Sequence, residues 1–177
     1  MLLTLETNRL ILRSFTIDDA KRVQELASNK DVAKTTLGIP HPYPIEAAEE
    51  WINNHPTMRN NGIFPFAIVL KTQDILIGTM TIRVDKTHKK AELAYWIGKE
   101  YWGNGYATEA AKEIVKYGFE SLYLNRIWGK TMAKNPASSK VMMNVGMRKE
   151  GLLKQDIVKS GVLEDIHIYG LTKSDYK

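Results

Sequence analysis

Two glycines at the start of a long helical pattern have the chemistry to hold an anion. Gly103 and Gly105 lie in residues 102–107 (WGNGYA), between an apolar run typical of a strand (91–97) and a periodic run typical of a helix (106–122). The free N–H groups at a helix start point outward, and the helix dipole adds partial positive charge there. Because glycine has no Cβ, the backbone can come close to an anion. The pattern therefore predicts a phosphate-bearing ligand and favours a cofactor.

The same turn also has a simpler interpretation, because short Gly-x-Gly turns often only connect a strand to a helix. It is not the dinucleotide fingerprint, which needs three glycines and follows the first strand of a βαβ unit. It is not a P-loop either, because no Gly-Lys-Ser/Thr follows it. The identity of the ligand must therefore come from the rest of the chain.

The composition describes an ordinary soluble protein. The 177 residues fit a single domain spanning residues 1–177. The absence of cysteine excludes disulfides, thiolate metal sites and a cysteine nucleophile, and fits a reducing compartment. Glu6, Arg9 and Arg13 interrupt the apolar core that a signal peptide needs, and no apolar stretch approaches the length of a membrane span. We therefore expect a cytoplasmic protein with no membrane partner.

The net charge of +5 is compatible with an acidic partner, but the lysines and arginines are spread along the chain. The dense cluster at residues 86–90 has the position of a hairpin tip, which favours a solvated face over a nucleic-acid groove. We expect no nucleic-acid partner.

The elements that must position the glycine turn follow from hydrophobic periodicity. Their order, β-α-α-β-β-β-α-β-α-β-β, predicts an α+β domain with a mixed sheet and helices on both faces. A capping box of Thr16 and Asp19 opens the first helix, which runs to about residue 28. A loop occupies residues 38–44. The predicted strands are 9–15, 64–70, 75–84, 89–97, 126–133, 148–158 and 163–171, and the other helices are 45–60, 106–122 and 136–145.

Several blocks, in the right order, resemble the GNAT superfamily of acetyltransferases. Together they resemble the branch that contains the ribosomal-protein N-terminal (alanine/serine) acetyltransferases, and the resemblance covers essentially the whole chain. The matching blocks are residues 6–13, 91–97 (AELAYWI), 101–110 (YWGNGYATEA), 135–141 (NPASSKV), 145–147 (VGM) and 165–169.

The resemblance implies acetyl-CoA as cofactor and direct attack of a primary amine in a ternary complex. Backbone N–H groups of the turn would hold the pyrophosphate, and the strand end at Trp96 and Ile97 would pair with the pantetheine arm. That pairing implies a mostly antiparallel sheet of about seven strands, splayed between the fourth strand and the fifth, which starts at Arg126. Asn135 would bond the pantetheine arm, although it could instead be only a helix N-cap. The implied cofactor-binding residues are Trp96, Ile97, Trp102, Gly103, Asn104, Gly105, Tyr106, Ala107, Thr108, Asn135, Ser138 and Lys140.

The chain departs from the superfamily pattern at three positions. Trp102 stands where Gln or Arg is usual, which matters little if the backbone binds the cofactor. Met142 replaces the tyrosine that often serves as the acid for the departing thiolate, so that role cannot be carried over. Met147 replaces a common phenylalanine, which is a tolerable apolar exchange.

Acetyl transfer needs a neutral amine, donors for the developing oxyanion and a proton for the thiolate. Ser138, three residues after Asn135 and matched by a serine in the related branch, is the candidate that assists the thiolate. Its alternative is a serine that bonds only backbone. Glu92, a carboxylate in an otherwise apolar strand, is the candidate base, acting through a water. Its alternative is a solvent-facing residue paired with a nearby lysine.

Tyr169 and His167 share one face of the last strand, by the period of two. We expect Tyr169 to line the site and contribute to catalysis, whereas a lone histidine more often packs. The four histidines show no metal-ligand spacing, so we predict no metal.

The acceptor site should be built by the 38–44 loop, the helix from Ile45 and the last hairpin. The branch resemblance favours the N-terminal amine of a (ribosomal) protein, and a polyamine or another small amine is the alternative. Glu46, Glu49 and Glu50 could form an acidic pocket for such a cation, or could be only helix residues. Two alternatives belong to other functional classes: a CoA-binding sensor without turnover, and a basic nucleic-acid binder. A homodimer is the default oligomeric state.

Overall fold

One eight-stranded sheet forms the centre of the computed structural model, which describes residues 3–177. Its order is β1-β2-β3-β4-β5-β6-β8-β7, and every neighbouring pair is antiparallel except β5 and β6. The predicted mixed, mostly antiparallel sheet is therefore confirmed, with one short strand more than expected. The strands are β1 (Leu5–Glu6), β2 (Leu10–Arg13), β3 (Ile63–Leu70), β4 (Ile75–Asp85), β5 (Lys90–Ile97), β6 (Arg126–Met132), β7 (Arg148–Lys159) and β8 (Val162–Thr172).

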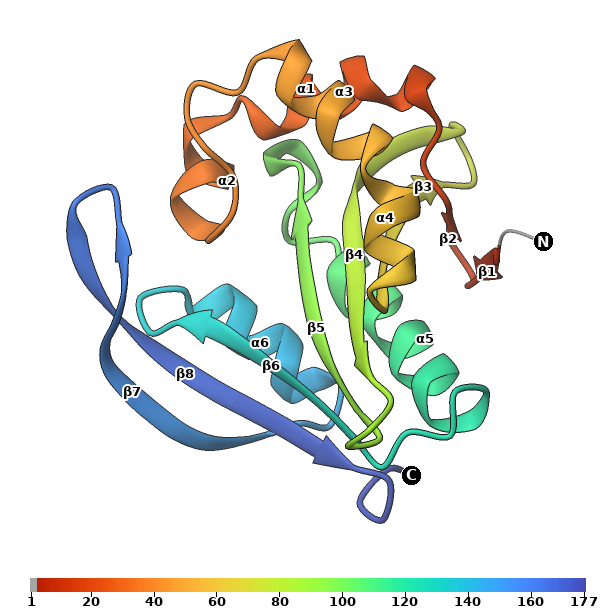
Figure 1. Cartoon of the computed structure of the whole chain (residues 1–177), viewed down its shortest axis with the longest axis vertical. Helices are drawn as coiled ribbons and strands as arrows, with labels where there is room; N and C mark the ends of the chain where they lie inside the picture. Colours follow the sequence, from red (N-terminus) through yellow and green to blue (C-terminus); the bar gives the residue numbers. More distant parts are fainter. Residues whose placement is uncertain (1–2) are drawn as a thin grey trace.

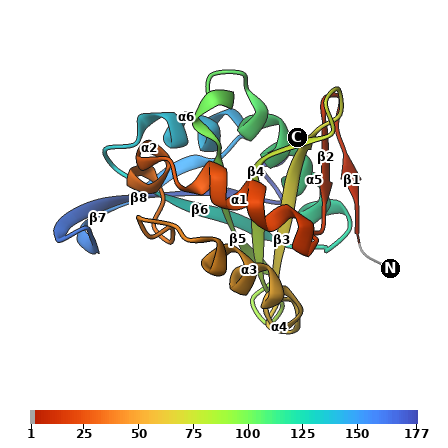
Figure 2. The same ribbon diagram turned by 90° about the horizontal axis from the view of Figure 1, so that it is seen from above.

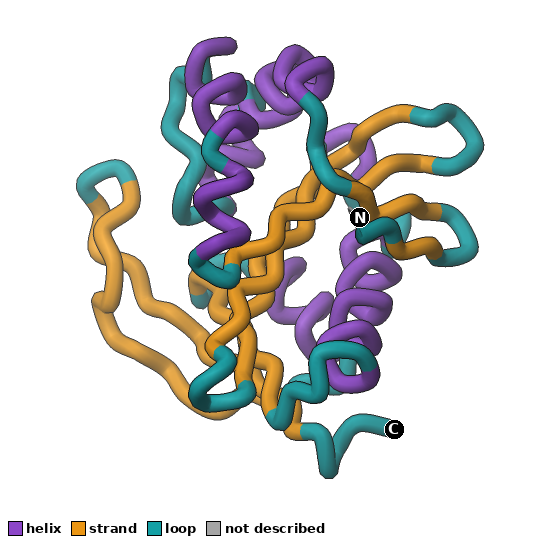
Figure 3. Tube along the Cα trace, turned by 45° about the vertical axis from the view of Figure 1, so that its right-hand side comes forward, coloured by secondary structure: helices purple, strands orange, loops and turns teal. Residues whose placement is uncertain are grey.

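Helices cover both faces of this sheet, as predicted (Figures 1, 2 and 3). The helices α1, α3 and α4 lie on one face, and α5 and α6 lie on the other. None of the helices in residues 3–177 has the length and apolar character needed to cross a membrane. The helices are α1 (Ala20–Ala27), α2 (Lys30–Thr35), α3 (Ile45–Asn53), α4 (His55–Asn60), α5 (Tyr106–Glu120) and α6 (Pro136–Asn144), with short 3-10 helices η1 (Ile17–Asp19) and η2 (Lys99–Tyr101).

The strand β3 shows why the central sequence is continuously apolar. Phe66 and Ile68 face the core beneath α5, whereas Ala67 and Val69 face the core beneath α1 and α3. A strand buried on both faces has no polar alternation. The sheet is thus a rigid layer that separates two sides of the molecule.

The strands β5 and β6 pair over only half their length. Their parallel register runs from Lys90–Arg126 to Leu93–Gly129 and stops there, while each strand continues beside its other neighbour. Figure 1 shows the two strands separating in the shape of a V. The predicted splay between these strands is therefore confirmed.

The helices differ from the sequence prediction in two places. The helix predicted over 45–60 is two helices, because Pro56 lacks the N–H that an interior helix residue donates and stands instead in the first turn of α4. The helix α2 was not predicted; it has six residues, and its N-cap is Asn29, whose side chain accepts the N–H of Asp31.

Candidate active site

Two cavities meet where β5 and β6 separate. The turn-side cavity, about 460 Å³, lies between the end of β5, the glycine turn, the start of α5 and α6. The sheet-face cavity, about 530 Å³, lies between β4, β5 and β6 and the segment from α2 to α4. Five residues line both: Thr35, Thr36, Tyr95, Trp96 and Ser138. The sheet would be a barrier if it were closed, so the splay is what connects the two.

The glycine turn has the backbone that an anion site needs. Gly103 and Gly105 have φ values of 78° and 77°, in the left-handed region that favours glycine. A Cβ at Gly103 would meet no atom within 4 Å, so its conformation, and not crowding, requires glycine. Gly105 is the N-cap of α5 and contributes no side chain to it, which leaves the first N–H groups of the helix for a ligand.

A carboxylate holds the glycine turn against the turn between β1 and β2. Glu109 accepts hydrogen bonds from Thr7 Oγ1 (2.6 Å), the Arg9 N–H (2.8 Å) and Arg9 Nε (2.6 Å). Arg9 Nη1 also donates to the Asn104 carbonyl (3.0 Å), and its guanidinium lies 4.5 Å from the centre of the Tyr106 ring. Burial acts to raise the pKa of Glu109, but these hydrogen bonds prevail and lower it. No role for Glu109 follows from the sequence pattern alone; its position in the matched 101–110 block is the available signal.

The end of β5 turns towards the gap backbone groups that β6 does not pair with. The Gly98 N–H donates to the Ile77 carbonyl on the β4 side. By alternation, the backbone groups of Ile97 and Tyr95 point the other way, into the splay. Trp102 Nε1 donates to the Ile97 carbonyl at 2.7 Å, so this side chain fixes the strand end. The contribution of Trp96 is its side chain, which lines both cavities.

The residues predicted to bind the cofactor mostly converge on the turn-side cavity. Asn104 does not line it; its amide instead donates to the carbonyls of Tyr101 and Trp102, both at 3.1 Å, and stabilises the turn. Asn135 lines it and also caps α6, because its Oδ1 accepts the Ser138 N–H at 3.2 Å. The predicted residues that line the cavity are Trp96, Ile97, Trp102, Gly103, Gly105, Tyr106, Ala107, Thr108, Asn135, Ser138 and Lys140.

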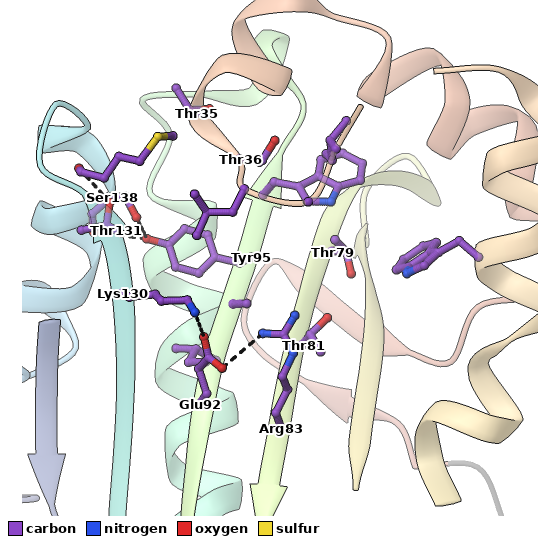
Figure 4. A pocket seen from close by; sticks show the side chains of 18 of the residues that line it. Thr35, Thr36, Thr79, Thr81, Arg83, Glu92, Tyr95, Lys130, Thr131 and Ser138 are labelled. Carbon is purple, nitrogen blue, oxygen red and sulfur yellow. Dashed lines mark hydrogen bonds and ion pairs between the residues drawn. The ribbon is translucent and has the colours of Figure 1, made fainter. Parts of the chain in front are cut away.

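A pair of hydroxyl groups lies at the junction of the cavities. A hydrogen bond of 2.7 Å joins Tyr95 Oη and Ser138 Oγ (Figure 4). Burial raises the pKa of Tyr95 to about 12, although the bond to Ser138 acts against it. Tyr95 therefore stays protonated and can donate. The sequence pattern does not single out Tyr95 as a functional residue. The alternation of a strand does not reveal which of its polar side chains meets a helix on the far side of the splay.

Glu92 lies on the floor of the sheet-face cavity, between two cations. Its carboxylate oxygens are 3.7 Å from Arg83 Nη1 and 3.7 Å from Lys130 Nζ, and its side chain is 16% exposed (Figure 4). The pairing with a lysine, held as the alternative, is thus present, together with an arginine. Its role as a base stays a prediction.

Tyr169 lines neither cavity. It lies opposite Gly129 and is 3% exposed within the main core. His167 is its neighbour, with ring centres 6.3 Å apart, and His167 Nε2 is 3.0 Å from Lys149 Nζ. Neither Tyr169 nor His167 lines a cavity of the site, so a catalytic role for Tyr169 gains no geometric support. Residues 3–177 contain no cluster of metal-ligating side chains.

The predicted acceptor segments contribute unequally. Gly38, Ile39 and Tyr43 of the loop and Trp51 of α3 line the sheet-face cavity, and so does Thr35 at the end of the unpredicted α2. The last hairpin contributes no lining residue, because β8 lies beyond β6. It instead supports the loop, where Lys159 Nζ donates to the Ile39 carbonyl at 3.1 Å.

The helix start with unpaired N–H groups suits a phosphate, and the splayed strands connect that position to a second cavity across the hydroxyl pair. This is the arrangement that a protein needs to bring a phosphate-bearing carrier to a second substrate. The family described as the acetyltransferase (GNAT) domain matches residues 9–148. The chain therefore belongs to the GNAT family, and it is an acetyl-CoA-dependent N-acetyltransferase.

Individual relatives agree with this assignment. The uncharacterized N-acetyltransferase p20 of Bacillus licheniformis is 33% identical over 175 residues, which cover 98% of each chain. The ribosomal-protein-serine acetyltransferase of Escherichia coli is 25% identical over 148 residues, 82% of each chain. The crystal structure of a GNAT acetyltransferase from Bacillus anthracis has a TM-score of 0.87 at 27% identity, covering 97% of this chain and 99% of that one. The resemblance to the ribosomal-protein branch is thus confirmed.

Proposed function

We propose that the protein acetylates a primary amine that enters through the sheet-face cavity, and that this amine is the N-terminus of a polypeptide. The observation that carries the proposal is the junction, where Tyr95 and Ser138 line both cavities and a hydrogen bond joins them. The E. coli relative is named a ribosomal-protein-serine acetyltransferase, which supports a polypeptide as the acceptor.

The residues at the junction have distinct roles in this proposal. When bound, acetyl-CoA supplies an activated acetyl group as a thioester. Ser138 Oγ donates a hydrogen bond to the departing sulfur, and Tyr95 holds that hydroxyl and can return a proton to it. Glu92 is three residues from Tyr95 along β5, so their Cα atoms are about 10 Å apart and their side chains point to opposite faces of the sheet. In this proposal Glu92 therefore acts on the amine only through water. Much of the remaining rate comes from holding amine and acetyl group together.

A polyamine is a weaker candidate. The ionised side chains that line the sheet-face cavity are Arg83, Glu92 and Lys130, two cations and one anion. Glu46, Glu49 and Glu50 do not line it, so the acidic pocket that a polycation needs has no counterpart there.

Release of CoA thiol with a panel of acceptors tests the proposal. The panel contains peptides with a free N-terminus, the same peptides with a blocked N-terminus, and spermidine. We expect release only with free N-termini. Release with spermidine alone would assign the small-amine alternative, and acetyl-CoA binding without release to any amine would assign a sensor.

A further inference from the structure

The sheet-face cavity carries two cations, Arg83 and Lys130, that have no role in the transfer reaction described above. Arg83 on β4, Glu92 on β5 and Lys130 on β6 stand side by side on the same face of three neighbouring strands (Figure 4). Arg83 is directly opposite Glu92 in the register. Three strands thus bring three ionised groups to one end of the cavity.

The hydrogen-bonding capacity of the two cations is largely unused. Both ion pairs with Glu92 measure 3.7 Å, which is longer than a hydrogen bond. Within residues 3–177, neither the Arg83 nor the Lys130 side chain has a hydrogen bond to another protein group. Their side chains are 44% and 37% exposed, so both remain open to a ligand. A guanidinium offers five N–H donors and an ammonium three.

The balance of charge favours an anion at this end. Glu92 offsets one of the two cations, and a net positive charge remains. A second ammonium would meet that excess, whereas a carboxylate could take bidentate hydrogen bonds from Arg83 and a further one from Lys130. Glu92 then has a positioning role, because it holds two like charges close together.

The register also sets the distance to the reacting amine. Glu92 and Tyr95 are three residues apart on β5, so their Cα atoms are about 10 Å apart and their side chains point to opposite faces of the sheet. The amine must approach the Tyr95–Ser138 pair, and the anion must reach Arg83 and Lys130. In an extended peptide, a separation of about 7–10 Å corresponds to two or three residues.

We propose that the acceptor carries a carboxylate two or three residues' length from its amine, and that Arg83 and Lys130 bind it. A polypeptide whose second or third residue is acidic has this chemistry, and so does a short amino acid of the same span. The inference rests on the proposed acetylation of an amine in this cavity.

Matched acceptors test the proposal through kcat/KM. We would compare four-residue peptides with a free N-terminus and an amidated C-terminus that carry Glu, Gln or Lys at the third position. The small-molecule arm compares 6-aminohexanoate with its amide. We expect the Glu peptide to exceed the Gln peptide by about tenfold, since hydrogen bonds to charged groups have this magnitude, and the Lys peptide to be poorest. A stronger preference for 6-aminohexanoate than for any peptide would place the carboxylate on a small molecule.

Variants test whether Arg83 and Lys130 cause the preference for the Glu peptide. Arg83→Gln and Lys130→Gln should each bring the Glu-to-Gln ratio close to one. Lys86→Gln, which removes the same charge from the β4–β5 turn outside the cavity, should keep the ratio. Circular dichroism confirms that each variant is folded. Turnover of all peptides at equal kcat/KM, or a ratio that survives both cavity variants, would overturn the inference alone. Acetyl-CoA binding with no thiol release to any acceptor would overturn the proposed function and the inference with it.

Discussion

Acid should destabilise this protein through one buried histidine. His55, the first residue of α4, is 2% exposed, and neither ring nitrogen has a hydrogen-bond partner within residues 3–177. Its ring lies edge-on to Trp51 and Phe15, with centres 4.5 and 5.3 Å away. Burial, with a smaller contribution from Arg59, lowers its pKa from 6.5 to about 4.

The sign of the effect follows from which state binds the proton. Between about pH 4 and pH 6.5 the unfolded chain protonates His55, whereas the folded protein keeps it neutral. The unfolded state therefore gains free energy as the pH falls, and folding stability declines. A pKa lowered from 6.5 to about 4 corresponds to about 3 kcal/mol in total, of which about 2 kcal/mol is lost by pH 5.

Urea unfolding followed by tryptophan fluorescence at pH 7.5, 6, 5 and 4.5 measures this loss, and His55→Phe is the control. Phenylalanine keeps an aromatic ring beside Trp51 and Phe15 but cannot take up a proton. Carboxylates with lowered pKa values, such as Glu109, contribute below about pH 4.5 in both proteins and cancel in the comparison. We expect the wild type to lose about 2 kcal/mol more than the variant between pH 7.5 and pH 5. Equal losses would refute the assignment to His55, whatever the stability of the variant at neutral pH.

Four further predictions concern the reaction. Ser138→Ala should lower kcat with little change in KM for acetyl-CoA, whereas Ser139→Ala, at a neighbour that lines neither cavity, should not; an unchanged kcat removes Ser138 from the mechanism. Tyr95→Phe, which removes the partner of Ser138, should lower kcat about tenfold, and steady-state kinetics with full activity would exclude a proton role. Glu92→Gln should alter the pH–rate profile, and a superimposable profile means that Glu92 is not the base. Glu109→Gln should raise KM for acetyl-CoA more than it changes kcat, because it loosens the glycine turn; an unaltered KM counts against that.

Much of the fold could be predicted because its signals are local. The stripe of α5, the apolar β3 and the turn residues of the hairpins each reveal themselves within about a dozen residues. The strand β1 was not predicted because two residues show no period. The helix α2 was not predicted because six residues form fewer than two turns. Elements this short are stabilised by what they contact and not by their own sequence pattern.

The site was predictable on one side only. The glycine turn is contiguous, and its backbone chemistry can be read directly from residue types. The sheet-face cavity, where we propose that the acceptor enters, combines β4, β5, β6 and the α2–α4 segment, so it depends on register between distant strands. The alternation of β5 places Glu92 among cations of two other strands, which no spacing within one strand could reveal. Tyr169 shows the same limit in another way. The prediction that Tyr169 and His167 share one face of β8 was right, but Tyr169 lies in the core and not in the site.

The tyrosine that the superfamily often carries on α6 is absent here, and β5 provides a phenol at the same gap. Met142, which stands at that position, is 1% exposed and packs so closely on Gly129 that a Cβ there would lie 2.5 Å from its methyl carbon. A phenol at position 142 would have to share that space. Tyr95 instead reaches α6 from the opposite side of the splay and bonds to Ser138. We interpret the hydroxyl pair as the replacement for that tyrosine. In this interpretation the proton comes from Tyr95 on β5 and reaches the thiolate through the hydroxyl of Ser138 on α6. This interpretation predicts that Met142→Tyr cannot rescue Tyr95→Phe, since the two phenols would approach from different elements; restored kcat in the double variant would contradict it.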